Sequence, residues 1–172
     1  IEEQLARYDI DGMERDFMRM EAYFRVGREL EGTAIMTAWL EDIRGLVRAA
    51  AKRRGHPIQL GVRVASRPET SRRLGLDTVV LAKKGLVDIV VPTPSSGAMA
   101  TEFDMPMHLW RDLLEPYGVK LAGCIEPGVL RYPGASYDPA TPETAVGSAV
   151  AVLAGGADAL YLFNYFPDRM SG

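Results

Sequence analysis

Acidic side chains stand at the ends of two strand-like runs in this sequence, and paired acids can carry out proton-transfer chemistry. Glu14 and Asp16 lie within residues 11–19, and Glu126 directly precedes Pro127. In parallel α/β sheets, ligands bind outside the carboxyl ends of the strands, so acids placed there indicate a site. One carboxyl group can protonate a leaving oxygen while another acts as nucleophile or base, which is what hydrolysis of a glycosidic bond requires.

The spacing of Glu14 and Asp16 predicts that both carboxylates lie on one face of a strand, about 7 Å apart along it. Like charges this close raise one another's pKa, so one acid can stay protonated near neutral pH and serve as a general acid. The alternative is an ion-pair network with Arg15 and Arg19. For Glu126, the corresponding alternative is a salt bridge that braces its loop.

Other residues near these acids are candidates for substrate contact. The alternating pattern around Arg63 places it opposite the aliphatic side chains of its own strand. Arg63 can hold a substrate or orient a catalytic acid, or it can form a buried ion pair with Asp88 or Glu14. Tyr161 and Asn164 can bind a sugar by stacking and hydrogen bonding, although an aromatic residue in a strand is more often part of the core. The candidate substrate contacts are Arg19, Arg63, Tyr161 and Asn164.

Strand-like and helical patterns alternate along the chain. The expected strands cover residues 10–18, 59–65, 86–91, 119–126 and 159–164. The expected helices cover residues 33–54, 105–117 and 141–155, and an interrupted helical connection with capping patterns at Ser66 and Asp77 covers residues 66–85. Connections of this length suit right-handed parallel crossovers, so the predicted fold class is α/β.

Two architectures fit this order of elements. One is an open doubly wound sheet of five strands, and the other is the C-terminal portion, about strands four to eight, of a TIM (β/α)8 barrel. The barrel is favoured because the sequence starts within a helical pattern and ends just after a strand. Residues 1–172 are then a single incomplete barrel domain with two unpaired strand edges, which need the missing barrel strands or a partner chain.

Composition argues against several classes of protein. The formal net charge is −3, and no Lys/Arg-rich stripe is present to attract nucleic acid. No apolar run approaches the ~20 residues of a membrane span. Cys124, His56 and His108 are too far apart for zinc-site spacing, so neither a metal nor a cofactor is expected. The composition indicates no particular localisation.

Three segments resemble the bacterial glycoside-hydrolase-like TIM barrels. They are Asp-Gly-Met-Glu-Arg-Asp-Phe-Met-Arg at 11–19, Phe-Asp-Met-Pro at 103–106 before the helix of Trp110, and Gly-Ala-Asp-Ala-Leu-Tyr-Leu-Phe-Asn at 156–164. Together they span nearly the whole chain. The resemblance implies that the first strand is barrel strand four and that the strand ending at Glu126 is barrel strand seven.

Many retaining glycosidases carry their acid/base and their nucleophile on those two strands. The resemblance therefore implies that Glu14 or Asp16 is the acid/base and that Glu126 is the nucleophile. The sequence departs from the usual pattern at Arg15, where an apolar residue facing the outer helices is expected, and at Ala159, where glycine is common. The departure at Arg15 leaves the choice between Glu14 and Asp16 open.

The leading hypothesis is a glycosidase that acts on a carbohydrate through these paired carboxylates. The alternative is a non-catalytic barrel that binds carbohydrate or serves as a scaffold. A flavodoxin-like domain that binds a phosphate ligand requires a glycine-rich turn after the first strand, and residues 18–21 offer none.

Overall fold

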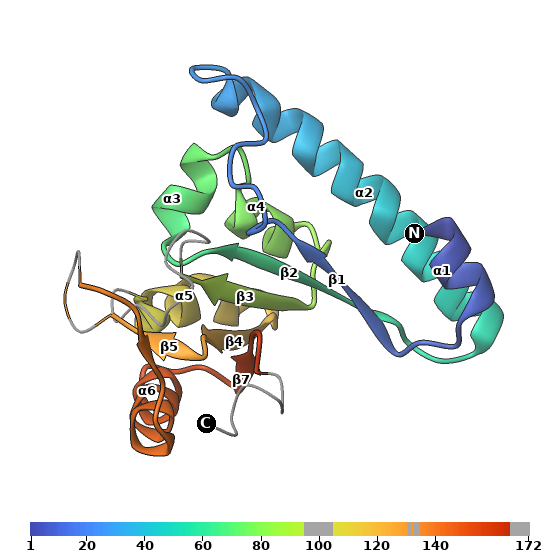
Figure 1. The fold of residues 1–172 in the computed structure, drawn as a ribbon. Helices are drawn as coiled ribbons and strands as arrows, with labels where there is room; N and C mark the ends of the chain where they lie inside the picture. Colours follow the sequence, from blue (N-terminus) through green and yellow to red (C-terminus); the bar gives the residue numbers. More distant parts are fainter. Residues whose placement is uncertain (95–104, 131, 133–134, 166–172) are drawn as a thin grey trace.

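A parallel five-stranded sheet forms the centre of the protein. The computed structural model describes residues 1–94, 105–130, 132 and 135–165. The strands are β1 (Gly12–Asp16), β2 (Gln59–Ala65), β3 (Ile89–Thr93), β4 (Lys120–Ile125) and β7 (Ala159–Leu162). They are adjacent in the order β1-β2-β3-β4-β7, and every pairing is parallel (Figure 1). The prediction of an α/β fold with five parallel strands is confirmed.

One helix precedes β1, and the others lie in the connections between the strands. They are α1 (Glu2–Arg7), α2 (Glu29–Arg54), α3 (Pro68–Arg73), α4 (Thr78–Lys83), α5 (Met107–Leu114), the 3-10 turn η1 (Glu115–Tyr117) and α6 (Pro142–Ala154). A short antiparallel hairpin of β5 (Gly128–Val129) and β6 (Asp138–Pro139) lies in the loop between β4 and α6.

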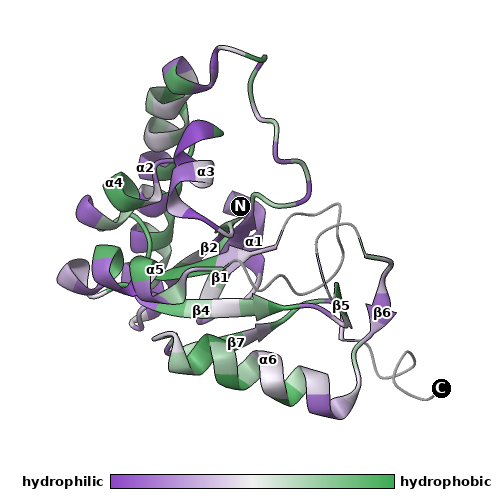
Figure 2. Cartoon of the chain, turned by 90° about the vertical axis from the view of Figure 1, so that its left-hand side faces the viewer, coloured by the Kyte–Doolittle hydropathy of each residue, from purple (hydrophilic) through white to green (hydrophobic). Residues whose placement is uncertain are grey.

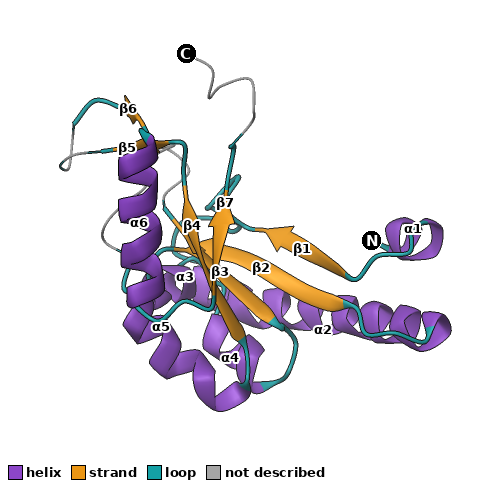
Figure 3. Ribbon diagram, turned by 90° about the horizontal axis from the view of Figure 1, so that it is seen from below, coloured by secondary structure: helices purple, strands orange, loops and turns teal. Residues whose placement is uncertain are grey.

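The helices α2, α4, α5 and α6 lie on one face of the sheet (Figure 3). Strand residues such as Leu60, Val62 and Leu121 share the main core with Leu40 of α2 and Trp110 of α5. A second, smaller apolar cluster on the opposite face contains only residues from β3, β4 and β7 and the position after β7: Val91, Ala122, Cys124, Ile89, Tyr161 and Phe163. Because a doubly wound sheet carries helices on both faces and reverses its strand order, the described residues do not form that architecture.

Helix α2 follows the predicted pattern closely. Its buried side chains include Leu40, Ile43 and Val47, which repeat at the spacing of one helical face. The helix starts at Glu29, four residues before the expected start at Thr33. It ends at Arg54 and is capped by Gly55, whose φ of 79° is the left-handed conformation that glycine adopts most easily.

Some predicted boundaries were wrong. The third strand begins at Ile89, because Leu86 and Val87 are buried in the connection after α4 and Asp88 lies just before the strand. Ser66 does not cap α3, whose N-cap is Arg67 and makes no side-chain bond. Asp77 does cap α4, accepting a hydrogen bond from the Val80 N–H at 3.1 Å.

One part of the predicted pattern falls outside the described residues. Phe103 and Asp104, which contributed to the family resemblance, belong to that part of the chain.

An ion pair joins the start of β3 to α2 and β2. Arg44 donates to both carboxylate oxygens of Asp88, at 2.7 and 2.5 Å, and the Leu60 N–H donates to the same carboxylate at 2.7 Å. Burial alone raises the pKa of Asp88, but the hydrogen bonds from Arg44 and Leu60 outweigh burial and hold it below 3.8. Asp88 therefore helps fix the helix layer to the sheet.

Replacing Asp88 with Asn should reduce the free energy of unfolding by about 1–3 kcal/mol at neutral pH. Because the folded pKa is depressed, the contribution of the charge is present above the unfolded pKa and is lost as pH falls through the folded pKa. Urea unfolding at several pH values should show the gap between parent and Asp88→Asn narrowing below about pH 4.

Glu41→Gln is the matched control, since the Glu41–Lys84 ion pair is about half exposed and should contribute at most about 1 kcal/mol. Equal stability of the parent and Asp88→Asn at neutral pH would contradict the role of Asp88.

Candidate active site

A buried arginine lies at the centre of the sheet face that the helices leave uncovered, here called the inner face. Arg63 on β2 is 2% exposed. Its Nη1 donates to Asp16 Oδ2 at 2.7 Å, and its Nε donates to Thr93 Oγ1 at 3.2 Å. The register of β1 and β2 places Asp16 directly beside Arg63. A buried cation of this kind is tolerated when it is paired and hydrogen-bonded.

Aromatic rings cover the guanidinium of Arg63 from the side of β7. Its Cζ lies 3.8 Å from the ring centroid of Phe163 and 5.8 Å from that of Tyr161. The two rings stack on each other, with centroids 6.5 Å apart and planes 21° apart. Arginine over an aromatic face gains cation–π attraction, so the rings add to the hydrogen bonds that fix this side chain.

Glu14 on β1 is connected to β7 across the inner face. Tyr161 donates its hydroxyl to Glu14 Oε1 at 3.0 Å. Burial raises the pKa of Glu14 above 4.5, the hydrogen bond from Tyr161 and the charge of Arg63 lower it in part, and the neighbouring Asp16 raises it. Glu14 is thus a partly desolvated acid with one of its oxygens held.

Tyr161 is a hydrogen-bond donor rather than a nucleophile in this arrangement. Burial, followed by the charge of Glu14 and the hydrogen bond to it, raises the pKa of Tyr161 to about 12. A phenol with that pKa stays protonated near neutral pH. Its role is therefore to orient Glu14.

Glu126 follows the last residue of β4 and is 5% exposed. Burial raises the pKa of its carboxyl group, and the charge of Arg63 offsets part of that effect. The hydroxyl of Tyr165 donates to the Glu126 backbone carbonyl at 2.8 Å. Asn164, just before Tyr165, has a φ of 58°, a left-handed conformation that turns the chain after β7.

Both carboxylate oxygens of Asp16 accept hydrogen bonds from groups within the fold. Oδ2 accepts from Arg63, and Oδ1 accepts from the Met18 N–H at 2.8 Å. The expected shared face of Glu14 and Asp16 is confirmed, since both interact with inner-face groups. The alternative network of Asp16 with Arg15 and Arg19 was wrong, because its partner is Arg63.

The predicted ion pair of Arg63 with Asp88 or Glu14 was also wrong. Asp88 lies at the opposite end of β3 from Thr93 and pairs with Arg44, so it cannot serve Arg63. Among the described ion pairs, the one that Arg63 forms is with Asp16 rather than Glu14. Glu14 interacts with Arg63 through its charge alone.

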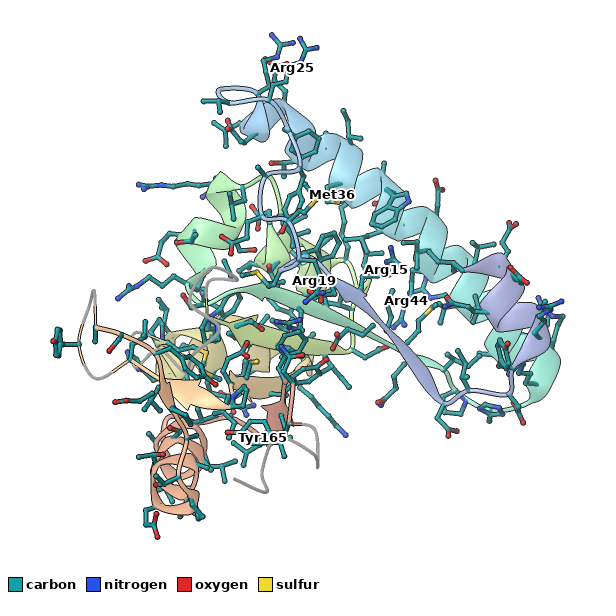
Figure 4. The ribbon with its side chains drawn as sticks, viewed as in Figure 1. Arg15, Arg19, Arg25, Met36, Arg44 and Tyr165 are labelled. Carbon is teal, nitrogen blue, oxygen red and sulfur yellow. The ribbon has the colours of Figure 1, made fainter. Side chains whose placement is uncertain are left out.

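Arg15 and Arg19 lie away from the inner face. The Arg15 guanidinium stacks over Trp39 of α2 at 5.2 Å, so the unexpected arginine does face the outer helix (Figure 4). Arg19 is exposed and shares with Trp39 a groove of about 540 Å³ formed by α2 and the loop after β1. Arg63, Tyr161 and Asn164, the other predicted substrate contacts, do not line this groove, so the structure separates Arg19 from them.

Thr93 and Phe163 were not predicted as members of the site. Both lie two residues after an inner-face residue, Thr93 after Val91 and Phe163 after Tyr161. Residues two apart in a strand point to the same face, so the positions of Val91 and Tyr161 would have placed Thr93 and Phe163 on the inner face beside Arg63. Cys124, predicted as a core filler, is fully buried, and burial raises its pKa to about 12.

A cavity of about 630 Å³ lies along the inner face on the amino-terminal side of Arg63. Its wall is mainly apolar, and its polar groups come from Glu14 and Tyr161 and, toward the amino-terminal ends of the strands, from Asp11, Gln59, Lys120 and Asp158. Its other lining residues include Gly61, Ile89, Val91 and Ala122. Small residues on β2 and β4 leave this space beside Glu14, whereas Asp16 and Glu126 do not line it.

The described residues offer no cluster of three or more His, Cys, Asp or Glu side chains suited to a metal ion. None of the described helices has both the length and the apolar character needed to cross a membrane.

Comparisons with known proteins give little guidance. No protein-family model and no curated protein matches the sequence. A solved structure of a proposed fructose-1,6-biphosphate aldolase from Coccidioides immitis is similar, with 16% identity and a TM-score of 0.47. The similarity covers 94% of this chain and 60% of that one, so this chain spans less than two thirds of its length. A likeness this distant supports no conclusion about fold or reaction.

Replacing Tyr161 with Phe should raise the pKa of Glu14, because the hydroxyl that favours its ionised form is removed while the ring stays in place. Carboxyl-detected NMR titration of labelled glutamate measures this directly. Tyr165→Phe is the control, because it also removes one tyrosine hydroxyl, but that hydroxyl donates to the backbone carbonyl of Glu126 rather than to Glu14. An unmoved Glu14 titration in folded Tyr161→Phe would show that the hydrogen bond is unimportant.

Proposed function

We propose that this chain is the strand-four-to-eight portion of a β/α barrel that hydrolyses glycosidic bonds, with Glu14 and Glu126 as its acid pair. The main supporting observation is that burial raises the pKa of both Glu14 and Glu126, while the charge of one buried arginine, Arg63, acts on both carboxyl groups. Such a pair can divide the roles of proton donor and nucleophile or base.

The strand order supports the barrel. Parallel strands that follow one another in sequence order, with helices on one face, are the repeating arrangement of a β/α barrel. A closed barrel fills its interior with inward side chains, and the polar residues at the carboxyl ends of its strands form the site. The burial of Arg63 on the uncovered face and the place of Glu126 directly after β4 support this proposal.

The edge strands β1 and β7, and the helices beside them, are evidence for further β/α units at both edges of the sheet. On the β7 side, α6 exposes Val146, Val150 and Leu153, which follow one helical stripe, and Figure 2 shows α6 as largely hydrophobic. On the β1 side, α2 exposes Ile35 and Trp39. Strand edges and apolar helix faces of this kind are normally covered in working proteins. We infer that three more β/α units, or a partner chain that supplies them, close the sheet.

Substitution at α6 tests this closure. Val150 is 59% exposed in this chain, but a neighbouring β/α unit would bury it. In the complete protein, Val150→Lys should lower the free energy of unfolding by about 1–3 kcal/mol, because an unpaired charge would enter an apolar contact. Thermal or urea unfolding measures the change.

Val26→Lys is the control, since Val26 is 97% exposed in the loop before α2 and the substitution should change stability by less than about 0.5 kcal/mol. If Val150→Lys were as neutral as Val26→Lys, the face of α6 would be uncovered and the barrel proposal would lose its support there.

Between the two candidate acids on β1, the contacts favour Glu14. Both oxygens of Asp16 already accept hydrogen bonds, from Arg63 and Met18. Tyr161 holds only Oε1 of Glu14, so Oε2 can carry the proton for a leaving oxygen. We assign Glu14 as the acid/base and Asp16 as its structural neighbour.

Glu126 is then the nucleophile. The charge of Arg63 favours its ionised form, which a nucleophile requires. The ring of Tyr161 and the cavity beside Glu14 give a carbohydrate a surface to contact.

Leaving-group chemistry separates the two roles. In the complete protein, Glu126→Gln should lose about 10²-fold or more of kcat on every glycoside, because no nucleophile remains. Glu14→Gln should lose a similar factor on alkyl glycosides but much less on dinitrophenyl glycosides, whose leaving group needs no proton. Hydrolysis is followed by release of sugar or phenol.

Near-parental turnover by Glu126→Gln would end the glycosidase assignment. If the parent binds a glycan but does not hydrolyse it, and Glu126→Gln binds it equally well, the protein is instead a non-catalytic carbohydrate-binding barrel.

A further inference from the structure

We propose that a helix with an acidic side chain packs along the first half of α2, in line with α1, and pairs its carboxylate with Arg15. The surface that this helix covers is the groove of about 540 Å³ between α2 and the loop after β1, here called the outer groove. The inference rests on the proposed function for its source, because the β/α unit that precedes β1 in the barrel would supply the helix.

The outer groove has an apolar floor whose rings hold one another in place. Phe17 lies edge-on to Tyr23 and to Trp39, with ring centroids 5.6 and 6.2 Å apart. The hydroxyl of Tyr23 also donates to the Phe17 carbonyl, which fixes the loop against the end of β1. Beside these rings, Met20 and Ile35 are 78% and 66% exposed. Apolar side chains that gather in one exposed groove mark an interaction site, whereas scattered ones do not.

One stripe of α2 is covered at its C-terminal end and open at its N-terminal end. Ile35, Trp39 and Ala50 are separated by four and eleven residues, close to whole helical turns, so they lie on one side of the helix. Ala50 is fully buried, whereas Ile35 and Trp39 are exposed. α1 lies beside the covered end, where Arg54 donates to the Leu5 carbonyl at 2.7 Å (Figure 1). The open part of the stripe therefore continues the side of α2 on which α1 packs.

The topology of the sheet favours a helix as the occupant. β1 is an edge strand, and α1 comes directly before it along the chain. Leu5 of α1 belongs to the main core that α2 also covers, so α1 lies in the helix layer. A further parallel strand beside β1 would be joined to it by a right-handed crossover, whose helix lies in that same layer. With α1 as its last turns, such a helix would run along α2 over Trp39 and Ile35.

Arg15 gives the outer groove a positive charge without a partner. Its Cζ lies 5.2 Å from the Trp39 ring centroid, and its Nε is buried with no hydrogen-bond acceptor in the part of the chain that the structure describes. Arg19 also lines the groove, and the acid that lines it, Asp16, already accepts hydrogen bonds on both oxygens. A buried donor without an acceptor costs free energy, and a carboxylate is the strongest acceptor for a guanidinium. The groove therefore favours a helix that brings an Asp or Glu to Arg15.

Thiol labelling of the complete protein tests whether a segment covers the groove. Ile35→Cys should react with a maleimide about tenfold or more slowly than Leu30→Cys, because a thiol within a helix contact reacts only when that contact opens. Leu30 is the matched control, since it lies in the same helix, is 72% exposed in this chain and does not line the groove. The parent protein, whose Cys124 is fully buried, gives the background rate.

Dilution separates a helix of the same chain from a second copy. Because the proposed helix is part of the chain, the slow labelling of Ile35→Cys should not depend on protein concentration. A labelling rate that rises toward that of Leu30→Cys on dilution would show that another molecule covers the groove, and it would overturn the proposal.

Substitution of Arg15 tests the acidic contact. In the Ile35→Cys background, Arg15→Met should speed labelling by about fivefold or more, because the carboxylate of the helix would be left buried and unpaired. Arg15→Lys keeps the charge and should restore most of the protection. Arg53→Met is the control, since Arg53 is exposed on α2 outside the groove, and it should leave the rate unchanged. Equal labelling rates with Arg15 and with Arg15→Met would refute the carboxylate.

The inference and the proposed function fail differently. If Ile35→Cys reacts as fast as Leu30→Cys in folded protein, the inference is overturned, whether or not the parent hydrolyses glycosides. If Ile35→Cys is protected, the Arg15 variants respond as expected and no glycoside is hydrolysed, the covering helix is supported and the glycosidase function is the part that fails.

Discussion

The burial of Arg63 is the constraint on which the inner face depends. Moving a guanidinium out of water costs several kcal/mol unless a partner compensates it, and here Asp16, Thr93 and Phe163 do so from three other segments. Those contacts require β1, β2 and β3 to keep the register that places Asp16 and Thr93 within reach. The pairing of β4 with β7 in the same sheet brings Tyr161 within reach of Glu14. One buried charge therefore connects the alignment of the strands to the arrangement of the acids.

The sheet separates two kinds of packing. On the helix side, aliphatic residues of the strands pack against α2, α4 and α5 in the main core, with Arg44 and Asp88 as a polar connection at one end. On the inner face, small residues and aromatic rings surround charged groups and leave a cavity. This division supports the proposal of a barrel portion, since a barrel places its helices outside and its chemistry at the mouth of the strands. It also explains the uncovered apolar stripe of α6, which a further β/α unit would bury.

Much of the fold could be predicted from sequence because strand and helix patterns are local. The alternation over 59–65 matched β2, and the apolar spacing in residues 33–54 matched the buried stripe of α2. The shared face of Glu14 and Asp16 followed from the two-residue repeat alone. The ends of elements were less accurate: Leu86 and Val87 are as apolar as a strand, but they are buried in a connection, and composition does not distinguish these two kinds of burial.

The sequence by itself determined which side chains share a face, because the direction of a side chain along a strand depends only on the backbone repeat. Tertiary structure decided which of them meet. That Arg63 pairs with Asp16 rather than Asp88, that Phe163 covers it, and that Arg19 lies in a different groove all depend on how separate strands align and on which end of each strand a residue occupies. Alignment is set by the assembly of the whole sheet, so no single segment carries that information.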